Sequence, residues 1–402
     1  MKLSALKKVF VGRPLPTAQA RHERLSKRTA LAVFASDALS SVAYATEEIL
    51  LILVGAGAVA LAYTIPIGIA ISILIVVVAS SYRQTILAYP QGGGAYIVTK
   101  DNLGTLPSLV AGAALLVDYV LTVAVSVAAG VAAVTSAFPV LFNHRVLLGV
   151  LCITLIATAN LRGIRESGAL FALPTYLFIV SFAGMLGYGY IRWALGWEMP
   201  PPEHAATATH AVTVFLLLRA FSQGCTALTG VEAVSDGVPA FKPSEARNAR
   251  IVLAVLALIL VTLFMGITFL ARHYHVLPAT EETVVSQLAH QIFGGGLLYY
   301  EIQAVTMMIL VLAANTSFAD FPRLSYFLAR DGFIPRQFGT RGDRLVFSNG
   351  ILILGGTAAV LIIVFGGDTH RLIPLYALNV FVSFTLSQSS IMRRWLTHRD
   401  ER

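Results

Sequence analysis

Ten apolar stretches, all long enough to be helices, follow one another along almost the whole chain. A membrane-spanning helix needs about 20 mostly apolar residues. Windows of about that length select residues 29–54, 62–82, 107–137, 146–161, 168–192, 212–240, 251–271, 298–320, 348–366 and 372–391. Only 12% of the residues are charged, whereas soluble domains carry about 25%. The weak alternating pattern of a membrane β-barrel does not occur in these stretches. We therefore predict an all-α integral membrane protein with about ten transmembrane helices.

The lysines and arginines are distributed very unevenly between the two sides of these spans. If the N-terminus is cytoplasmic, 24 of the 29 basic residues lie in the termini and loops on that side. Cytoplasmic segments of membrane proteins carry this excess, so we expect both termini to be cytoplasmic and the protein to lie in the plasma or inner membrane. The net charge of +8 follows from this asymmetry. The lipid bilayer is the expected partner, and no nucleic-acid partner is needed to explain this charge.

The spans divide into two sets of five. A proline-containing linker at 197–211 separates a first repeat at 29–196 from a second repeat at 212–391. A basic cytoplasmic segment at 1–28 and a cytoplasmic tail at 392–402 complete the predicted organisation. Because five is an odd number, the second set enters the membrane in the opposite orientation. This arrangement is typical of the inverted repeats of transporters.

The first span of each set is interrupted by small polar residues and a carboxylate. Asp37 lies in the interruption at 36–44, and Glu232 follows Thr229 and Gly230 in the interruption at 226–233. A membrane helix is broken only where its freed backbone groups face protein or water. A buried carboxylate costs energy unless it has a partner or a ligand. We therefore expect discontinuous helices in spans one and six, with the binding site of a secondary transporter between them.

The third span carries an acid and two hydroxyls on one face. Thr122 and Ser126 follow Asp118 by four and eight residues, so their side chains point in the same direction from a helix. Hydroxyls of this kind often bond only to backbone carbonyls. An acid aligned with them in the middle of a span favours a role in binding a ligand or a proton.

Other polar residues near the ends of spans leave more than one interpretation. Tyr376, which follows Pro374 in the tenth span, fits either a ligand site or an interfacial aromatic belt. Glu47 and Glu48 lie near the outer end of span one, and Glu301 lies near the outer end of span eight. We expect these acids, together with Arg219, to form gates or interfacial pairs. In the outer loop before span eight, residues 283–292 predict a short helix that ends at a run of glycines.

No sequence pattern supports an enzyme or a resident cofactor. The G-x-G-x-x-A pattern at 55–60 ends a membrane helix, whereas a dinucleotide fingerprint follows a strand of a soluble βαβ unit. Cys152 and Cys225 both lie inside spans, so we predict neither a disulfide nor a metal framework.

Two loop motifs resemble those of the amino acid–polyamine–organocation (APC) superfamily. Residues 89–96, which read Tyr-Pro-Gln-Gly-Gly-Gly-Ala-Tyr, resemble its P-x-x-G-G-x-Y signature. Residues 329–335, which read Ala-Arg-Asp-Gly-Phe-Ile-Pro, resemble its R-D-G-x-x-P loop. The resemblance implies the LeuT-type five-plus-five inverted repeat, in agreement with the count of spans.

Within that superfamily, nearly the whole chain resembles the KimA-type branch of potassium–proton symporters. The resemblance is carried by the segments at 36–44, 116–119, 227–232 and 372–376. It implies that the cation path is lined by Asp37, Tyr44, Asp118, Thr122, Ser126, Thr229, Glu232 and Tyr376. It further implies that potassium is held by Tyr44, Asp118, Ser126, Glu232 and Tyr376, and that proton coupling involves Asp118, Glu232 or Asp37.

Members of this branch carry two more spans and a large cytoplasmic C-terminal domain, which is associated with dimerisation and with inhibition by cyclic di-AMP. The present sequence stops at Arg402. We therefore expect a fragment or a natural short form, for which a homodimer is implied by the resemblance alone.

Import of potassium coupled to protons is the function that these observations favour. A dehydrated cation needs a cage of oxygens, and coupling needs an acid whose pKa responds to the cation beside it. The alternative is a proton-coupled amino acid permease. In such permeases a glycine-containing first break binds the substrate carboxylate, whereas residues 40–43 read Ser-Ser-Val-Ala. The acids at both breaks would also repel a carboxylate. A receptor or scaffold would not explain acids in the middle of the membrane.

Overall fold

The computed structural model describes residues 24–92, 94–162, 168–197, 211–339 and 347–397. Within these ranges the regular structure is helical, apart from an isolated bridge between Leu25 and Phe241. Most of the predicted basic segment at 1–28 and of the linker at 197–211 lies outside the described residues, as do the last residues of the tail at 392–402.

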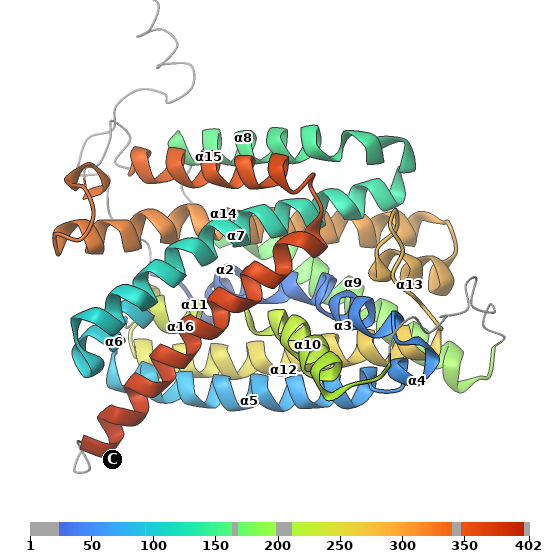
Figure 1. Ribbon diagram of the computed structural model, residues 1–402, viewed down its shortest axis with the longest axis horizontal. Helices are drawn as coiled ribbons and strands as arrows, with labels where there is room; N and C mark the ends of the chain where they lie inside the picture. Colours follow the sequence, from blue (N-terminus) through green and yellow to red (C-terminus); the bar gives the residue numbers. More distant parts are fainter. Residues whose placement is uncertain (1–23, 93, 163–167, 198–210, 340–346, 398–402) are drawn as a thin grey trace, which may run out of the picture.

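The helices of the first half precede residue 198, and those of the second half follow residue 210 (Figure 1). The first half contains α2 (Lys27–Ser40), α3 (Ala45–Val54), α4 (Gly57–Leu61), α5 (Thr64–Ala88), α6 (Ala95–Leu103), α7 (Thr105–Ala137), α8 (Arg145–Leu161) and α9 (Gly168–Ala194). The second half contains α10 (Val214–Gly224), α11 (Ala233–Asp236), α12 (Glu245–His273), α13 (Val284–Phe293), α14 (Leu297–Arg330), α15 (Ser348–Val364) and α16 (Thr369–Thr397). Short 3₁₀ turns join some of them: η2 (Ser41–Ala43), η3 (Pro139–His144), η4 (Cys225–Leu228), η5 (Val238–Ala240) and η6 (Arg336–Gly339).

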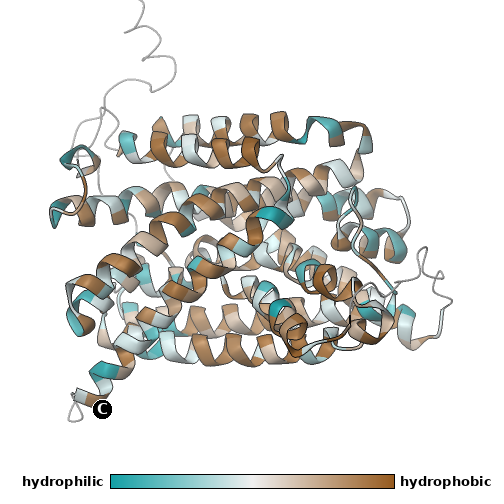
Figure 2. Cartoon of the chain, in the orientation of Figure 1, coloured by the Kyte–Doolittle hydropathy of each residue, from teal (hydrophilic) through white to brown (hydrophobic). Residues whose placement is uncertain are grey.

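The surface of the bundle suits lipid better than water. In the described part of the chain, eight helical segments are long and apolar enough to cross a membrane, and α15 is a shorter apolar helix. Apolar residues run along the helices, while many polar residues lie at helix ends and in connections (Figure 2). Leu155 of α8, for example, is 71% exposed, which would be unfavourable in water. The chain is therefore a multi-pass membrane protein.

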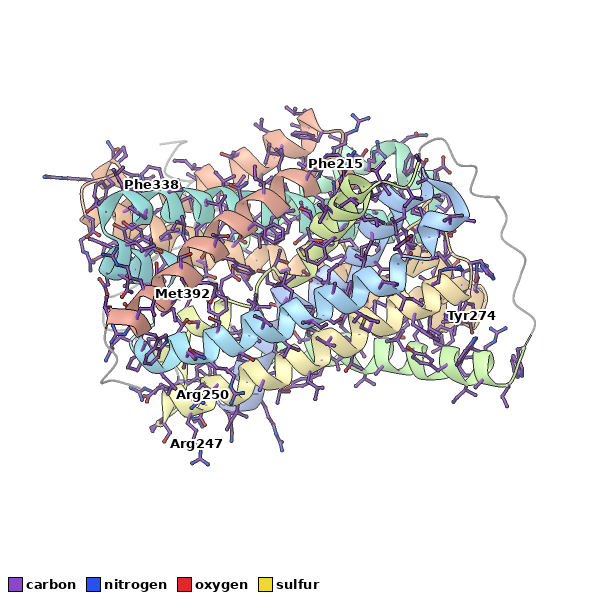
Figure 3. The ribbon with its side chains drawn as sticks, turned by 60° about the horizontal axis from the view of Figure 1, so that its bottom comes forward. Phe215, Arg247, Arg250, Tyr274, Phe338 and Met392 are labelled. Carbon is purple, nitrogen blue, oxygen red and sulfur yellow. The ribbon has the colours of Figure 1, made fainter. Side chains whose placement is uncertain are left out.

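The ends of the connecting and long helices follow local signals in the sequence. The short helix predicted at 283–292 is confirmed as α13, whose Thr283 hydroxyl accepts a hydrogen bond from the Ser286 amide at 3.2 Å. The helices α14 and α16 extend beyond the apolar stretches at 298–320 and 372–391. Figure 3 labels Arg247 and Arg250 near one end of α12 and Tyr274 just past its other end. This helix thus runs along most of the length of the bundle.

Helices of the two halves pack in matching pairs. The helix α12 packs against α5, α14 against α7, and α15 against α8. The helix α9 packs against α2, and α16 packs correspondingly against η4. Likewise, α9 packs against α14, and α16 packs against α7. The connecting helices α6 and α13 lie at opposite ends of the bundle (Figure 1). Several arrangements in the first half therefore have an equivalent in the second.

Both polar segments singled out in the sequence depart from α-helical geometry. In the first, α2 passes through the 3₁₀ turn η2 before α3 begins. In the second, η4 is followed by a turn in which Thr229 is extended, with ψ of 147°, and Gly230 has a φ of +74°. Only glycine adopts such a positive φ without strain. The main chain of the second segment therefore leaves the helix direction between η4 and α11.

The two segments cross each other in an antiparallel sense. The helix α10 packs against α3, η4 against η2, and α11 against α2. Two glycines permit close contact at the ends of this crossing: a Cβ on Gly224 would lie 2.5 Å from Ile49, and one on Gly237 would lie 2.2 Å from Phe34. Because real Cβ contacts are longer, these positions require glycine or a local shift. The crossing brings the middles of both segments together.

Candidate functional site

Asp37 lies directly against the backbone of the second segment. A Cβ on Gly230 would be 2.8 Å from Asp37 Oδ2 and 2.6 Å from the Ala38 amide nitrogen. The absence of a side chain at Gly230 is therefore what allows the carboxylate and the turn to touch. Residues that are almost 200 positions apart in the sequence form one site here.

The hydroxyls of both segments donate to the backbone. Ser40 and Ser41 donate to the carbonyls of Asp37 and Ala38, at 2.7 and 2.6 Å. Thr229 donates to the Thr226 carbonyl at 2.9 Å. A hydroxyl that donates its hydrogen in this way keeps its oxygen lone pairs as acceptors. These oxygens thus remain suited to a donor or a cation.

The predicted residues of α7 lie in the interior beside α16. Thr122 donates to the Tyr376 hydroxyl at 3.1 Å, and both side chains are buried. Asp118, one turn earlier, is 5% exposed, and its Oδ1 has no hydrogen-bond partner. Ser126 is buried one turn beyond Thr122 on the same face. The Thr122–Tyr376 hydrogen bond brings the buried Tyr376 side chain together with the polar face of α7.

Three carboxylates gather where the two segments and α7 meet. Asp118 interacts electrostatically with Asp37 and with Glu232. Glu232 Oε2 is buried and, like Asp118 Oδ1, has no hydrogen-bond donor among the described residues. Tyr44 faces Thr229 and lies near Asp37. Buried acceptor atoms that lack donors are costly, so the arrangement suits a proton, a cation or both.

The helix ends at the crossing add to this negative potential. The carbonyl ends of α2 and of α10 with η4 both point into it, and the C-terminus of a helix carries a partial negative charge. At the amide end of α3, the chain supplies its own carboxylates, because Glu47 and Glu48 lie in the first turn. These two carboxylates point to His370 and to the amino end of α13, away from the crossing.

The site has few of the groups that make a resident metal centre. Among the described residues, no group of three or more His, Cys, Asp or Glu side chains is spaced to hold a metal ion. The available oxygens are mainly hydroxyls, main-chain carbonyls and separate carboxylates. Such a set resembles the weak oxygen cages that bind alkali cations transiently.

Sequence reasoning missed two residues that lie near the carboxylates. Tyr82 of α5 is buried and interacts electrostatically with Glu232. Asp320 of α14 interacts electrostatically with Asp37. Neither position had a distinguishing signal, because a tyrosine or an acid close to the end of a span also fits the membrane interface.

The expected pairing of Glu47 and Glu48 with Arg219 is wrong. Arg219 is exposed on α10, while His370 lies between the two carboxylates. His370 lies just before the apolar stretch of the last span, where no sequence pattern distinguishes it from a loop residue. Its partners are more than 300 residues away in the chain, a separation that no local pattern can bridge.

Comparison with known proteins agrees with this architecture. A family model described as amino acid permease matches residues 25–402. The chain belongs to the amino acid permease family. Among the relatives of this family member is the potassium transporter KimA of Bacillus subtilis (strain 168), which is 51% identical over 397 residues. The match covers 98% of the present chain and 65% of that relative, so the chain spans about two thirds of the relative's length.

The two loop motifs of this permease family member pack at one end of the bundle. Asp331 accepts hydrogen bonds from the Tyr96 hydroxyl at 2.8 Å and from Lys100 Nζ at 2.6 Å. The hydrogen bond and charge of Lys100 lower the pKa of Asp331 below its ordinary value. Gly94, which precedes α6, closely approaches Asp236: a Cβ there would lie 3.3 Å from the carboxylate. The motifs thus tie α6 to α14 and to α11.

Proposed function

We propose that this chain is a secondary active transporter that imports potassium together with protons by alternating access. The observation that carries this proposal is the meeting of Asp37, Asp118 and Glu232 at the crossing of the two interrupted segments. Two of these carboxylates have buried oxygens without hydrogen-bond donors. A cation or a proton satisfies them, whereas the carboxylate of an amino acid would be repelled.

The relative KimA, which is a potassium transporter, supports the choice of potassium. In this proposal Tyr44, Ser126 and Tyr376 supply uncharged oxygens, and Asp118 and Glu232 supply charged ones. Thr122 orients Tyr376 through its hydrogen bond, and Thr229, which is fixed by its bond to the Thr226 carbonyl, faces Tyr44. Asp118 and Glu232 exchange the coupled proton, with Asp37 as a relay toward the cytoplasm.

The proposed fold is the LeuT-type five-plus-five inverted repeat with ten transmembrane helices. In it, α2 with α3 forms the discontinuous first helix, and α10 with α11 forms the discontinuous sixth. The matching helix contacts of the two halves support this assignment, as does the antiparallel crossing of the interrupted segments. Membership of the permease family gives further support.

We also propose that both termini face the cytoplasm of a cell whose plasma or inner membrane holds the protein. The concentration of lysine and arginine on one side supports this orientation. In this arrangement α6 lies at the cytoplasmic end and α13 at the outer end. A homodimer, expected from the family resemblance, is part of the proposal but has no support beyond it.

The decisive experiment is cation flux into proteoliposomes that contain the purified chain. We expect potassium-dependent uptake that is accompanied by proton entry. Asp118→Asn should reduce uptake by roughly a hundredfold, because an amide cannot supply charge or exchange the proton. Asp101→Asn is the control, since Asp101 is an exposed acid on α6, and it should leave uptake unchanged.

Two outcomes would contradict the proposal. Full uptake with normal proton dependence in Asp118→Asn would exclude the assigned role of Asp118. Absence of potassium flux together with proton-driven uptake of amino acids would favour the alternative, an amino acid permease, for which the family description is the supporting observation.

A further inference from the structure

A second group of buried acids lies outside the proposed cation site, at the opposite end of the bundle from α6. Glu47 and Glu48 of α3 are 3% and 0% exposed. His370, at the start of α16, approaches both: Nδ1 is 2.5 Å from Glu48 Oε1, and Nε2 is 3.6 Å from Glu47 Oε1. The contact with Glu48 is a hydrogen bond, and the contact with Glu47 lies within ion-pair distance. A protonated imidazole at this place is a cationic partner for both carboxylates.

The same group joins three helices. Glu47 Oε2 also accepts a hydrogen bond from the Val284 amide at 3.2 Å. Val284 is the first residue of α13, where helix amides lack partners within the helix. The carboxylate therefore holds the amino end of α13 to α3, while His370 holds α16 to the same place.

The other charged groups around His370 do not supply a second cationic partner for Glu47 and Glu48. Asp368 accepts from the His370 amide at 3.0 Å and pairs with Arg371 at 3.2 Å. Arg145 of α8 donates to the Gly366 carbonyl at 2.8 Å, and Glu282 beside α13 accepts from Ser286. Both arginines are thus engaged elsewhere. His370 is the basic side chain that contacts Glu47 and Glu48.

The second repeat contains an equivalent of Glu47. Residues 38–42 read Ala-Leu-Ser-Ser-Val, and residues 227–231 read Ala-Leu-Thr-Gly-Val. Continuing this alignment without gaps pairs Thr46 and Glu47 with Ser235 and Asp236. Asp236 approaches Gly94 at the amino end of α6, as Glu47 meets the amino end of α13. Each interrupted segment thus presents one carboxylate to the connecting helix of the other repeat.

The two equivalent carboxylates have different basic neighbours. Asp236 interacts electrostatically with Arg323 of α14, and an arginine stays charged at every physiological pH. The neighbour of Glu47 is an imidazole, whose ordinary pKa is about 6.5. Similar connections at the two ends of the bundle therefore differ in their response to pH.

We propose that His370, Glu47 and Glu48 form a proton-operated latch that closes one end of the cation path. With the proton bound, the imidazolium joins α3 to α16, and Glu47 also holds α13. When the proton leaves His370 for water, both carboxylates lose their cationic partner, and α13 and α16 separate from α3. The location of this latch along the path rests on the proposed function. In the proposed orientation it faces the outside.

A cysteine placed between the latch and the cation site tests this directly. Ala129 lies on the face of α7 that carries Asp118 and Thr122, toward the end where the Thr283 amide bonds Ser136. Ala129→Cys is made in the full chain with Cys152→Ser and Cys225→Ser, and is labelled with a membrane-impermeant thiol reagent. Its rate is divided by that of Glu281→Cys, an exposed position beside α13, which removes the pH dependence of thiol reactivity.

We expect this normalised rate to rise roughly tenfold between about pH 7 and pH 9.5, because the two carboxylates keep the proton on the imidazole beyond the pH at which a free imidazole loses it. His370→Gln should give fast labelling at both pH values, and His370→Lys, with a lasting positive charge, slow labelling at both. His290→Gln is the matched control, because His290 is an exposed histidine of α13, and it should keep the pH dependence. Glu48→Gln should weaken the dependence and provides the same test if a His370 variant does not fold.

A normalised rate that does not change with pH in the parent protein would overturn the proposal. So would an unchanged pH dependence in a folded His370→Gln or Glu48→Gln variant. The labelling does not require transport, so a chain that carries another substrate can still show the latch. Conversely, cation flux without a pH-dependent rate would leave the proposed function intact and exclude the latch.

Discussion

The hydrogen bond between Thr122 and Tyr376 connects the third and last spans within the site. We predict that Tyr376→Phe weakens potassium binding about threefold to tenfold, because one well-placed oxygen contributes about 1 kcal/mol. The aromatic ring still fills its space, so the thermal midpoint should change little. Binding to the purified protein measures the effect. Tyr63→Phe, at an exposed tyrosine, should leave the affinity unchanged.

Thr122→Val should produce most of the same loss, and the double variant little more, because both substitutions remove one interaction. Fully additive losses would mean that the two hydroxyls act separately. The sequence alone placed Thr122 on the correct face of its helix through the four-residue spacing. It could not pair Thr122 with Tyr376, since the two are 254 residues apart.

Contact between the two interrupted segments depends on the missing side chain of Gly230. We predict that Gly230→Ala destabilises the protein by about 2–4 kcal/mol, from the strain of positive φ and from overlap with Asp37. Transport should be lost as well. Gly196→Ala is a matched control: its φ of +65° is close to that of Gly230, but a Cβ there meets nothing within 4 Å. That variant should lose only about 1 kcal/mol from backbone strain.

Thermal unfolding in detergent and potassium flux distinguish the two variants. Equal destabilisation by both substitutions would show that overlap with Asp37 adds nothing to the cost of backbone strain. The sequence indicated a break near Gly230, because glycine and hydroxyl residues interrupt an apolar run. The direction of the turn, and the carboxylate that packs against it, depend on the crossing of two distant segments and could not be predicted locally.

The attachment of α6 to α14 through Asp331 should depend on acidity. Lys100 and Tyr96 favour the charged carboxylate and lower its pKa in the folded protein. Its stabilising effect is therefore complete above the ordinary aspartate pKa of about 3.9. The effect is lost as the pH falls through the lower, folded-state value. We predict that Asp331→Asn lowers the thermal midpoint at neutral pH and that the difference shrinks progressively below about pH 4.

Midpoints measured across this pH range check the prediction, with Asp101→Asn as an exposed-acid control. A difference that stays constant down to the lowest pH would mean that the charge of Asp331 is not involved. The motif at 329–335 was recognisable from sequence. Its contact with Tyr96 of the other motif depends on the packing of α6 near the end of α14, which joins residues 235 positions apart.

The arrangement of the entire chain across the bilayer gives a separate test. In a Cys152→Ser, Cys225→Ser background, we predict that Glu281→Cys reacts with an impermeant maleimide in intact cells. Arg336→Cys should react only after permeabilisation. Both side chains are exposed, so the difference reports their side of the membrane. The reverse pattern would exclude cytoplasmic termini.

Hydropathy predicted most helices well because transfer of an apolar segment into lipid depends mainly on its own composition. It was less reliable for polar groups. The cationic partner of Glu47 and Glu48 is His370 and not Arg219, because the contact of α16 with α3 decides which base reaches them. Pairs of this kind are decided by packing between repeats, which a single sequence does not encode locally.

The pairing of Glu47 with Asp236 bears on how the chain responds to its surroundings. If the two halves were identical and related by a two-fold axis in the membrane plane, acid on either side would affect transport in the two directions equally. The two carboxylates have different basic neighbours, His370 beside Glu47 and Arg323 beside Asp236. The two sides should therefore differ in their sensitivity to pH. A single histidine cannot alter the equilibrium distribution of ions, which the gradients determine. It can make the rate of transport depend on the pH of one compartment and not on the pH of the other.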